Sequence, residues 1–261
     1  AASDVYKRQG IMKLNQAVGI IMGANIGTTV TSWLLSLTGI QGDNLFVELL
    51  KPSSFTPILA IVGVSMILFA KSSRPKDIGT IMIGFSVLMF GMDTMSEAVK
   101  PLADVPEFTR LFTVFENPIL GVIAGTILTA VIQSSSASVG ILQALCLTGA
   151  VSYSSAIPII MGQNIGTCIT ALLSAIGASK NAKRTAMVHL LFNIIGTLFF
   201  LVVLYAGNAL FHFPFWGDVM NRGSIANLHL SFNVACTLLL LPFNRVLVKI
   251  CLLYTSDAAD D

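Results

Sequence analysis

Long apolar runs separated by short polar segments make up most of this chain. The runs are about 17–25 residues long, which is the length that a helix needs to cross a bilayer core of ~30 Å. Strands of a membrane barrel would be shorter and would alternate between apolar and polar residues. The pattern predicts an all-α integral membrane protein, a multi-span helical bundle with spans at about 17–39, 54–70, 78–98, 156–178, 185–207 and 224–249.

One apolar run, at 119–148, differs from the others because a polar cluster interrupts it at its centre. The cluster is Gln133-Ser134-Ser135-Ser136, and the apolar halves on either side are too short to cross a membrane comfortably. Non-helical backbone at membrane depth is tolerated where it is buried in protein or lines a wet cavity. We therefore expect 119–148 to form a re-entrant helical hairpin with its tip at the serines.

Two parts of the chain repeat one another at a spacing of 139 residues. The segments Ile20–Thr28 and Ile159–Thr167 align without a gap and differ only at Ala24 and Gln163. The same spacing would place a counterpart of the serine cluster before the first residue of this sequence. We therefore expect the chain to belong to a longer reading frame.

The charges of the loops predict which side of the membrane each loop occupies. Short basic loops at 71–76 and 180–184 are expected on the cytoplasmic side. The loops at 40–53 and 100–118 carry more acidic residues and are expected outside. When 119–148 is counted as re-entrant, the side on which each loop lies agrees with the side that its charge predicts.

The same count orients the two repeats in opposite directions across the membrane. Repeat 1 is expected at 10–98 and repeat 2 at 119–250. Inverted repeats whose broken helices meet near the middle of the membrane are typical of secondary transporters.

The two ends of the chain have an unusual relation to each other. Residues 1–9 and 251–261 back-translate to DNA sequences that are almost reverse complements of one another. They resemble a sequencing adapter, so we expect both ends to be non-native and exclude them from the fold.

The serine cluster offers groups that bind an anion without a charged side chain. The hydroxyls of Ser134, Ser135 and Ser136 can donate hydrogen bonds, and a helix that starts there adds free N–H groups at its positive end. Gln133 can donate to an oxyanion or present its oxygen to a cation. The spans contain no Lys or Arg near mid-depth, which argues against an anion site built on a buried cation. The alternative is polar packing, because small residues let membrane helices approach closely.

A second candidate site lies in the repeated element, which suits a hard monovalent cation such as sodium. Its amide and hydroxyl side chains recur at intervals of three along one helical face, at Asn25, Thr28, Thr31, Asn164, Thr167 and Thr170. Glycines beside them would permit either a helix break that frees carbonyl oxygens or close packing, at Gly23, Gly27, Gly162 and Gly166. A seam of small residues that serves only packing is the alternative.

Three further sets of residues have simpler interpretations. Two His-Leu-x-Phe-Asn segments, at 189–193 and 229–233, could line a pathway or hydrogen-bond one helix to another. Asp93 and Glu97, near an external membrane end, favour an interfacial pair over a proton relay. The cysteines lack the spacing of a metal site and are expected to be small hydrophobic residues.

These motifs together resemble the bacterial branch of the type II sodium–phosphate cotransporter family. The resemblance rests on Gln133-Ser134-Ser135-Ser136-Ala137-Ser138, on the paired Gly-x-Asn-Ile-Gly-Thr elements and on the His-Leu-x-Phe-Asn pairs. It implies two inverted repeats, each with a Gln-Ser-Ser-Ser hairpin, and sodium-driven movement of phosphate by alternating access. It also implies a multi-pass protein of the bacterial cytoplasmic membrane with no cofactor besides sodium as the coupling ion. The implied partners are phosphate, sodium and lipid, and nucleic acid is not among them. Assembly into a homodimer is possible but not implied.

The resemblance also assigns site residues. It implies that phosphate is bound by Gln133, Ser134, Ser135 and Ser136. It implies a sodium site formed by Asn25, Thr28, Gln133, Ser135, Asn164 and Thr167.

Other functions remain open at this point. A transporter of another oxyanion or of a small organic acid would use the same neutral donors. An intramembrane serine hydrolase would use one of Ser134–Ser136 as nucleophile and His189 as base, although no nucleophile elbow is present. A packing or scaffold module would need the small residues for helix contacts alone.

Overall fold

The computed structural model describes residues 14–39 and 51–254, and these form helices joined by short turns. One isolated antiparallel bridge joins Ser152 and Val219. The α-helices are α2 (Leu14–Ser36), α4 (Pro52–Phe69), α5 (Ser73–Val99), α6 (Pro106–Val114), α7 (Pro118–Ile132), α8 (Ser135–Leu145), α9 (Tyr153–Ala175), α10 (Lys180–Phe211), α11 (Arg222–Leu240) and α12 (Asn244–Tyr254). Short 3-10 turns occur at η1 (Leu37–Gly39), η2 (Lys100–Asp104), η3 (Cys146–Thr148) and η4 (Leu241–Phe243).

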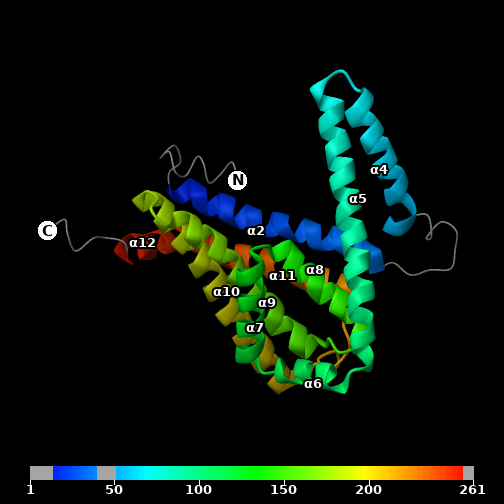
Figure 1. The fold of residues 1–261 in the computed structure, drawn as a ribbon. Helices are drawn as coiled ribbons and strands as arrows, with labels where there is room; N and C mark the ends of the chain where they lie inside the picture. The colour runs from blue at the N-terminus through cyan, green and yellow to red at the C-terminus, as the bar shows by residue number, and fades with distance from the viewer. Residues whose placement is uncertain (1–13, 40–50, 255–261) are drawn as a thin grey trace.

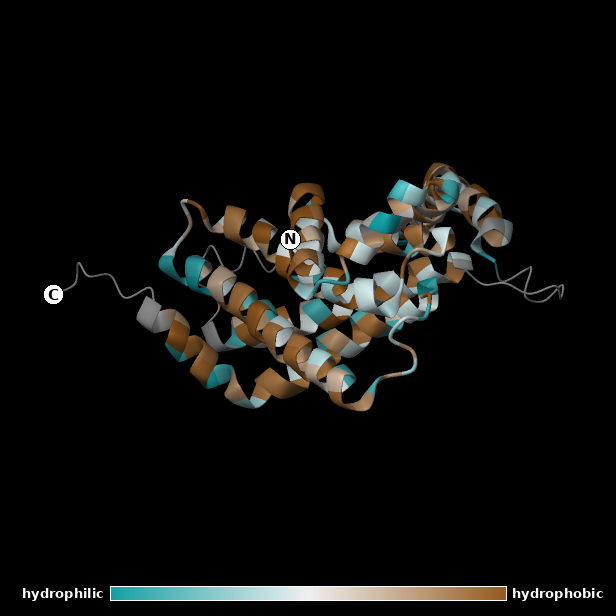
Figure 2. Cartoon of the chain, turned by 90° about the horizontal axis from the view of Figure 1, so that it is seen from below, coloured by the Kyte–Doolittle hydropathy of each residue, from teal (hydrophilic) through white to brown (hydrophobic). Residues whose placement is uncertain are grey.

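Five stretches in the described part of the chain are long and apolar enough to cross a membrane. They comprise α2, α5 with η2, α9, α10, and α11 with the start of α12, and α9 is the most buried of them. The hydrophobic residues run along nearly every helix, whereas hydrophilic residues gather at turns and at a few helix faces (Figure 2). The prediction of an all-α, multi-span membrane protein is confirmed.

Helices α4 and α5 form a hairpin whose turn end projects away from the other helices, while the second half of α5 packs against α8 and the end of α2 (Figure 1). The two helices meet where Gly63 and Gly79 face each other, and a Cβ on Gly63 would lie 2.8 Å from the Gly79 carbonyl oxygen. The outer faces of the hairpin remain apolar and open, with Leu68 and Phe69 exposed at 69% and 81%. In a membrane these faces contact lipid, which is as apolar as the side chains themselves.

The predicted hairpin at 119–148 has its break where the serine cluster predicts it. Helix α7 ends at Ile132, Gln133 takes a left-handed conformation with φ 59°, and α8 begins at Ser135. The two helices have 15 and 11 residues, and at 1.5 Å per residue neither reaches across ~30 Å of hydrocarbon. Helix α7 is itself bent by 110° from α6, which precedes it.

Glycines fix the contact between α7 and α9, which pack together more extensively than any other pair of helices. A Cβ on Gly125 would overlap the Ile159 carbonyl oxygen, and one on Gly162 would overlap the Val122 carbonyl oxygen. The Thr126 hydroxyl donates to the Gly162 carbonyl oxygen at 3.1 Å. Close backbone approach through small residues, with hydrogen bonds across the seam, is how membrane helices gain packing energy.

The repeat predicted from the sequence is visible in the lengths of the helices. Shifting α2 by 139 residues gives the bounds of α9, and each helix has 23 residues. The possibility of a helix break at the Asn-Ile-Gly-Thr elements is wrong, because both helices run through them without interruption. The alternative of close packing holds for α9. On α2, a Cβ at Gly23 or Gly27 would meet no atom of the described residues within 4 Å.

One predicted boundary is corrected by the structure. The span expected at 224–249 begins earlier, at Arg222, and is interrupted at η4, because Pro242 has no backbone N–H to continue the helix. The termini expected to be non-native lie mostly outside the described residues, although Cys251 is buried at the end of the described chain, in α12.

We predict that Gly162→Ala destabilises the protein by about 1–3 kcal/mol, because the added methyl group is forced against the α7 backbone. The midpoint of thermal unfolding in detergent measures this loss. Gly84→Ala is the matched control, since a Cβ at Gly84 on α5 meets no atom of the described residues within 4 Å. Equal midpoints for the two variants would contradict the close contact between α7 and α9.

Candidate functional site

The tip of the α7–α8 hairpin presents helix N–H groups beside serine hydroxyls. The Ser134 hydroxyl caps α8 by accepting from the Ala137 N–H at 3.3 Å. The N–H groups of Ser135 and Ser136, in the first turn of α8, have no acceptor within their own helix. Gln133 and Ser134 are exposed, whereas Ser135 and Ser136 are half-buried. The left-handed turn at Gln133 separates the end of α7 from the start of α8, so the positive end of α8 lies at the hairpin tip.

Ser134 and Ser136 line a groove of ≈ 400 Å³ between α8, α5 and the end of α2. Every other residue of the lining is apolar, and the set is Leu35, Val87, Leu88, Gly91, Met92, Met95, Ala137, Gly140 and Ile141. The groove thus combines two hydroxyls at a helix N-terminus with walls that carry no charge. Hydrogen bonds in such an apolar setting are stronger than in water.

Buried hydrogen bonds attach the hairpin to α9 directly behind the tip. The Thr129 hydroxyl donates to the Ser138 hydroxyl at 2.7 Å, which joins α7 to α8. The Gln163 amide donates to the Ser138 carbonyl oxygen at 2.9 Å, which joins α8 to α9. Gln163 and Ser138 are fully buried. The Gln163 side-chain oxygen has no hydrogen-bond partner among the described residues, so it remains available as an acceptor.

The predicted sodium ligands of repeat 2 lie next to this attachment. Asn164 directly follows Gln163, is buried, and donates to the Ile160 carbonyl oxygen at 2.9 Å. The Thr167 hydroxyl donates to the Gln163 carbonyl oxygen at 2.8 Å. Because a hydroxyl that donates still has lone pairs, this bond leaves the Thr167 oxygen able to bind a cation.

The predicted sodium ligands of repeat 1 are placed differently. Asn25 is buried on α2 and its side-chain oxygen lies 3.1 Å from the His189 Nε2. The Thr28 hydroxyl donates to the Ala24 carbonyl oxygen at 3.0 Å, as Thr167 does in its own helix. The contacts of α2 with α8 are made further along α2, where Leu35 faces Gly140. Asn164 and Thr167 therefore lie on the helix that bonds the hairpin through Gln163, whereas Asn25 pairs with His189 on α10.

The two histidines of the repeated His-Leu-x-Phe-Asn segments both contact α2. His189 on α10 pairs with Asn25, and the His229 Nδ1 on α11 lies 2.9 Å from the Ser32 hydroxyl. These contacts confirm the alternative in which the histidines bond one helix to another. They also direct His189 to an amide on α2, which is not the arrangement of a base paired with a serine nucleophile.

Arg222 is a buried cation that the sequence analysis missed. Its guanidinium donates to the Thr38 hydroxyl and, at 2.5 Å, to the Ser96 hydroxyl. The sequence analysis began the last span two residues later and so left Arg222 in a loop. The signal that could have found it is Asn221, which caps α11 by accepting from the Ser224 N–H at 2.8 Å.

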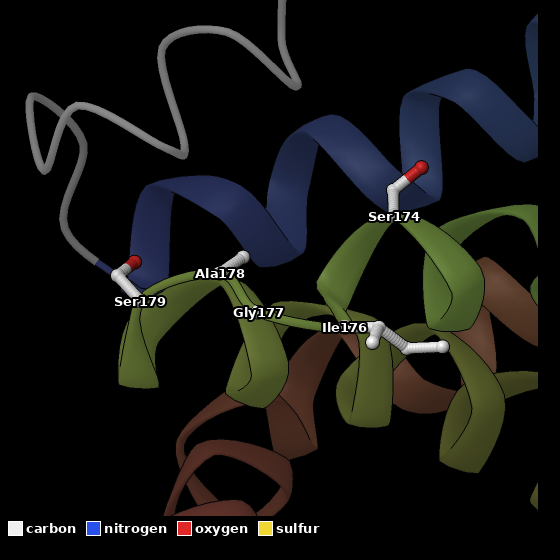
Figure 3. Close-up of a pocket in the computed structure, with 5 residues that line it drawn as sticks. All are labelled: Ser174, Ile176, Gly177, Ala178 and Ser179. Carbon is white, nitrogen blue, oxygen red and sulfur yellow. The ribbon is translucent and has the colours of Figure 1, made fainter.

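A second hollow lies at the turn between α9 and α10, away from the serine hairpin. Its volume is ≈ 280 Å³, and it is lined by Ser174, Ile176, Gly177, Ala178 and Ser179. The hydroxyls of Ser174 and Ser179 lie on one side of the turn, while the Ile176 side chain points in another direction (Figure 3). None of the predicted site residues takes part in this lining.

Comparison with known proteins gives consistent results along the chain. The family model described as Na+/Pi-cotransporter matches residues 7–97 and 88–216. YqeW of Bacillus subtilis is 29% identical over 243 residues, which are 92% of this chain and 73% of that protein. YjbB of Salmonella typhimurium, named a putative inorganic phosphate export protein, is 25% identical over 247 residues, covering 94% of this chain.

A mammalian protein shares part of the same sequence. The sodium-dependent phosphate transport protein 2A of Rattus norvegicus is 34% identical over 142 residues, or 51% of this chain and 22% of its own length. The chain spans 42% of the length of YjbB. No solved structure matches. Since the family model covers most of the chain, from Lys7 to Trp216, and includes the serine hairpin and both Asn-Ile-Gly-Thr elements, this chain belongs to the Na+/Pi-cotransporter family.

Proposed function

We propose that this protein moves inorganic phosphate across the membrane by alternating access, coupled to sodium, and that the α7–α8 hairpin tip binds the phosphate. The observation that carries the proposal is the neutral groove in which Ser134 and Ser136 lie at the N-terminus of α8. The names of the relatives, one a phosphate exporter and one a sodium-dependent phosphate transporter, support the substrate.

The chemistry of the tip fits an oxyanion. Phosphate oxygens accept hydrogen bonds, and the tip offers hydroxyls, two uncapped N–H groups and the positive end of a helix. Gln133 adds an amide that is free to turn, since it is exposed at the junction of the two helices. These donors hold an anion in place without a fixed positive charge.

The neutrality of the groove gives a physical reason for sodium coupling. No residue of the groove lining carries a charge, and its walls are mostly aliphatic. Transfer of an unpaired phosphate anion from water into such a site is very costly. Cations that enter with the anion remove most of this cost, so sodium bound nearby makes phosphate binding depend on sodium.

The oxygen-rich side chains around the tip supply a sodium site. Asn164 and Thr167 on α9 lie beside Gln163, whose buried oxygen has no partner among the described residues. Gln133 and Ser135 offer further oxygens at the tip itself. Asn25 and Thr28 occupy the equivalent positions on α2 and are assigned the corresponding role for repeat 1.

Alternating access fits the position of α8 between the two repeats. Helix α8 contacts α2 and α5 of repeat 1 on one side and α9 and α11 of repeat 2 on the other. A substrate held at its N-terminus is therefore enclosed by both repeats. A rocking motion of one repeat against the other would expose this substrate first to one side and then to the other.

We predict that Ser136→Ala, which removes a hydroxyl from the groove lining, raises the phosphate concentration for half-maximal uptake by about 10–100-fold. The reason is that a hydroxyl-to-anion hydrogen bond contributes about 1.5–3 kcal/mol. The measurement is uptake of radiolabelled phosphate into proteoliposomes that contain the product of the complete gene, with and without a sodium gradient. Ser65→Ala on α4 is the matched control, because the Ser65 hydroxyl is exposed and bonds only within its own helix.

Two results would count against this proposal. Uptake that proceeds equally without sodium would remove the coupling and leave phosphate transport alone. If folded protein takes up sulfate or a small carboxylate but no phosphate, the hairpin tip binds a different anion from the one proposed.

We predict that Thr167→Val raises the sodium concentration for half-maximal phosphate uptake several-fold, since it removes one oxygen from the sodium site while keeping the shape of the side chain. At saturating sodium the apparent affinity for phosphate should recover. Thr80→Val on α5 is the matched control, because the Thr80 hydroxyl makes the same bond to a carbonyl four residues earlier but is exposed. An unchanged sodium dependence in Thr167→Val would exclude this oxygen from the site.

A further inference from the structure

A network of buried hydrogen bonds lies two helical turns along α8 from the tip and joins both repeats. The Gln143 amide on α8 donates to the Ser32 carbonyl oxygen on α2 at 2.9 Å and to the Arg222 carbonyl oxygen on α11 at 3.2 Å. The Ser32 hydroxyl in turn pairs with His229 on α11. Gln143, Ser32 and His229 are at most 1% exposed. None of these residues is part of the proposed ion and phosphate sites.

Arg222 extends this network to the ends of α2 and α5. Its side chain is 6% exposed and reaches across from α11 to Thr38, in η1 after α2, and to Ser96 near the end of α5. A single side chain of repeat 2 thus donates hydrogen bonds to two separate elements of repeat 1, η1 and α5. Arginine suits this contact because its planar fork of donors reaches two acceptors at once.

The partners of Arg222 are hydroxyls, which makes the contact reversible. A buried arginine paired with a carboxylate would resist separation, whereas bonds to two hydroxyls can be exchanged for bonds to water. Its Nε atom is buried and has no hydrogen-bond partner among the described residues. Asp93 lies one helical turn before Ser96 on the same helix, α5. The carboxylate is therefore a candidate partner for the guanidinium when the bond to Ser96 breaks.

The orientation predicted from loop charges places this contact on the outer side of the membrane. Helices α2 and α5 run outward in that orientation and end at Thr38 and Ser96, while α11 starts at its outer end with Arg222. Three outer ends, two from repeat 1 and one from repeat 2, therefore meet at one side chain. A transporter that works by alternating access must close and open such a meeting point.

We propose that Arg222 is a positioning residue that holds the outer ends of the two repeats together, and that its bonds to Thr38 and Ser96 break when the outer pathway opens. This inference rests on the proposed function, because it assigns Arg222 to the closed outer side of the transport cycle. Through its carbonyl oxygen and Gln143, the same residue ties the outer part of α8 to this closure.

A native cysteine near the start of α11 allows the closure to be measured. Cys146 in η3 is 8% exposed and lies in the same buried apolar cluster as Met220 and Ile225, which flank Arg222 in the sequence. The experiment applies a membrane-impermeant thiol reagent to right-side-out vesicles that contain the product of the complete gene, and follows modification of each cysteine by mass spectrometry. Cys168, fully buried in α9, is the internal reference for general loosening of the fold.

We predict that Arg222→Gln raises the rate of Cys146 modification at least about tenfold, since both bonds to repeat 1 are lost. The rate at Cys168 should stay unchanged. Arg222→Lys keeps the charge but lacks the fork, so it should give an intermediate rate. Arg245→Gln, an exposed arginine on α12, is the matched control and should behave as the native protein does.

Three results would overturn the inference. These are an unchanged rate at Cys146 in Arg222→Gln, a parallel rise at Cys146 and Cys168, and a rise seen only in inverted vesicles. If Arg222→Gln does not fold, the pair Thr38→Val and Ser96→Ala removes the acceptors instead, and the same outcomes decide. Phosphate uptake by the native protein is measured in parallel. Its absence would refute the proposed function, while the cysteine rates still report whether Arg222 holds the two repeats together.

Discussion

The backbone contact between α7 and α9 is the interaction on which the rest of the site depends. A hairpin of two short helices cannot satisfy its polar tip in lipid, so it needs a neighbour that accepts it closely along its length. Gly125 and Gly162 provide that closeness, because any side chain at either position would overlap the opposing backbone. With the helices this close, Gln163 reaches the hairpin and bonds the Ser138 carbonyl oxygen. The serine tip is therefore held in position by α9, the helix that also carries Asn164 and Thr167.

Most of the fold was predictable because membrane helices are recognisable in the sequence by their length and apolar character. The break in the hairpin was also predictable, since a run of one amide and three serines within apolar sequence has few structural explanations. Contacts between helices were harder to predict from the sequence. Gln163 differs from its counterpart Ala24 by one long polar side chain, yet only the structure shows that this side chain crosses to α8. Arg222 was missed because a single cation at a helix boundary resembles a loop residue until its partners on α2 and α5 are known.

The structure shows that the two copies of the repeated element have the same helix but different surroundings. On α9 the glycines are covered by α7, whereas on α2 the equivalent Gly23 and Gly27 face no atom of the described residues within 4 Å. A helix with this sequence does not need the cover in order to form, since α2 and α9 have equal lengths. The repeated pattern therefore specifies both a helix and a glycine face on which another helix can pack. The helix forms whether or not that face is covered. In repeat 2 the helix bonds the hairpin through Gln163, whereas Ala24, the counterpart of Gln163 on α2, has no polar side chain for such a bond.

Charge is distributed in a way that links the proposed site to the proposed outer contact. The groove at the tip is neutral, so in the proposed function the co-transported ions balance the charge of a bound phosphate. A fixed arginine in the groove would bind phosphate without sodium and would release it reluctantly. The buried arginine lies instead at the start of α11, where hydroxyls accept from its side chain and its carbonyl oxygen accepts from Gln143, two helical turns along α8 from the tip. In the function we propose, this separation lets sodium control occupancy of the site, while Arg222 holds the outer ends of the two repeats together.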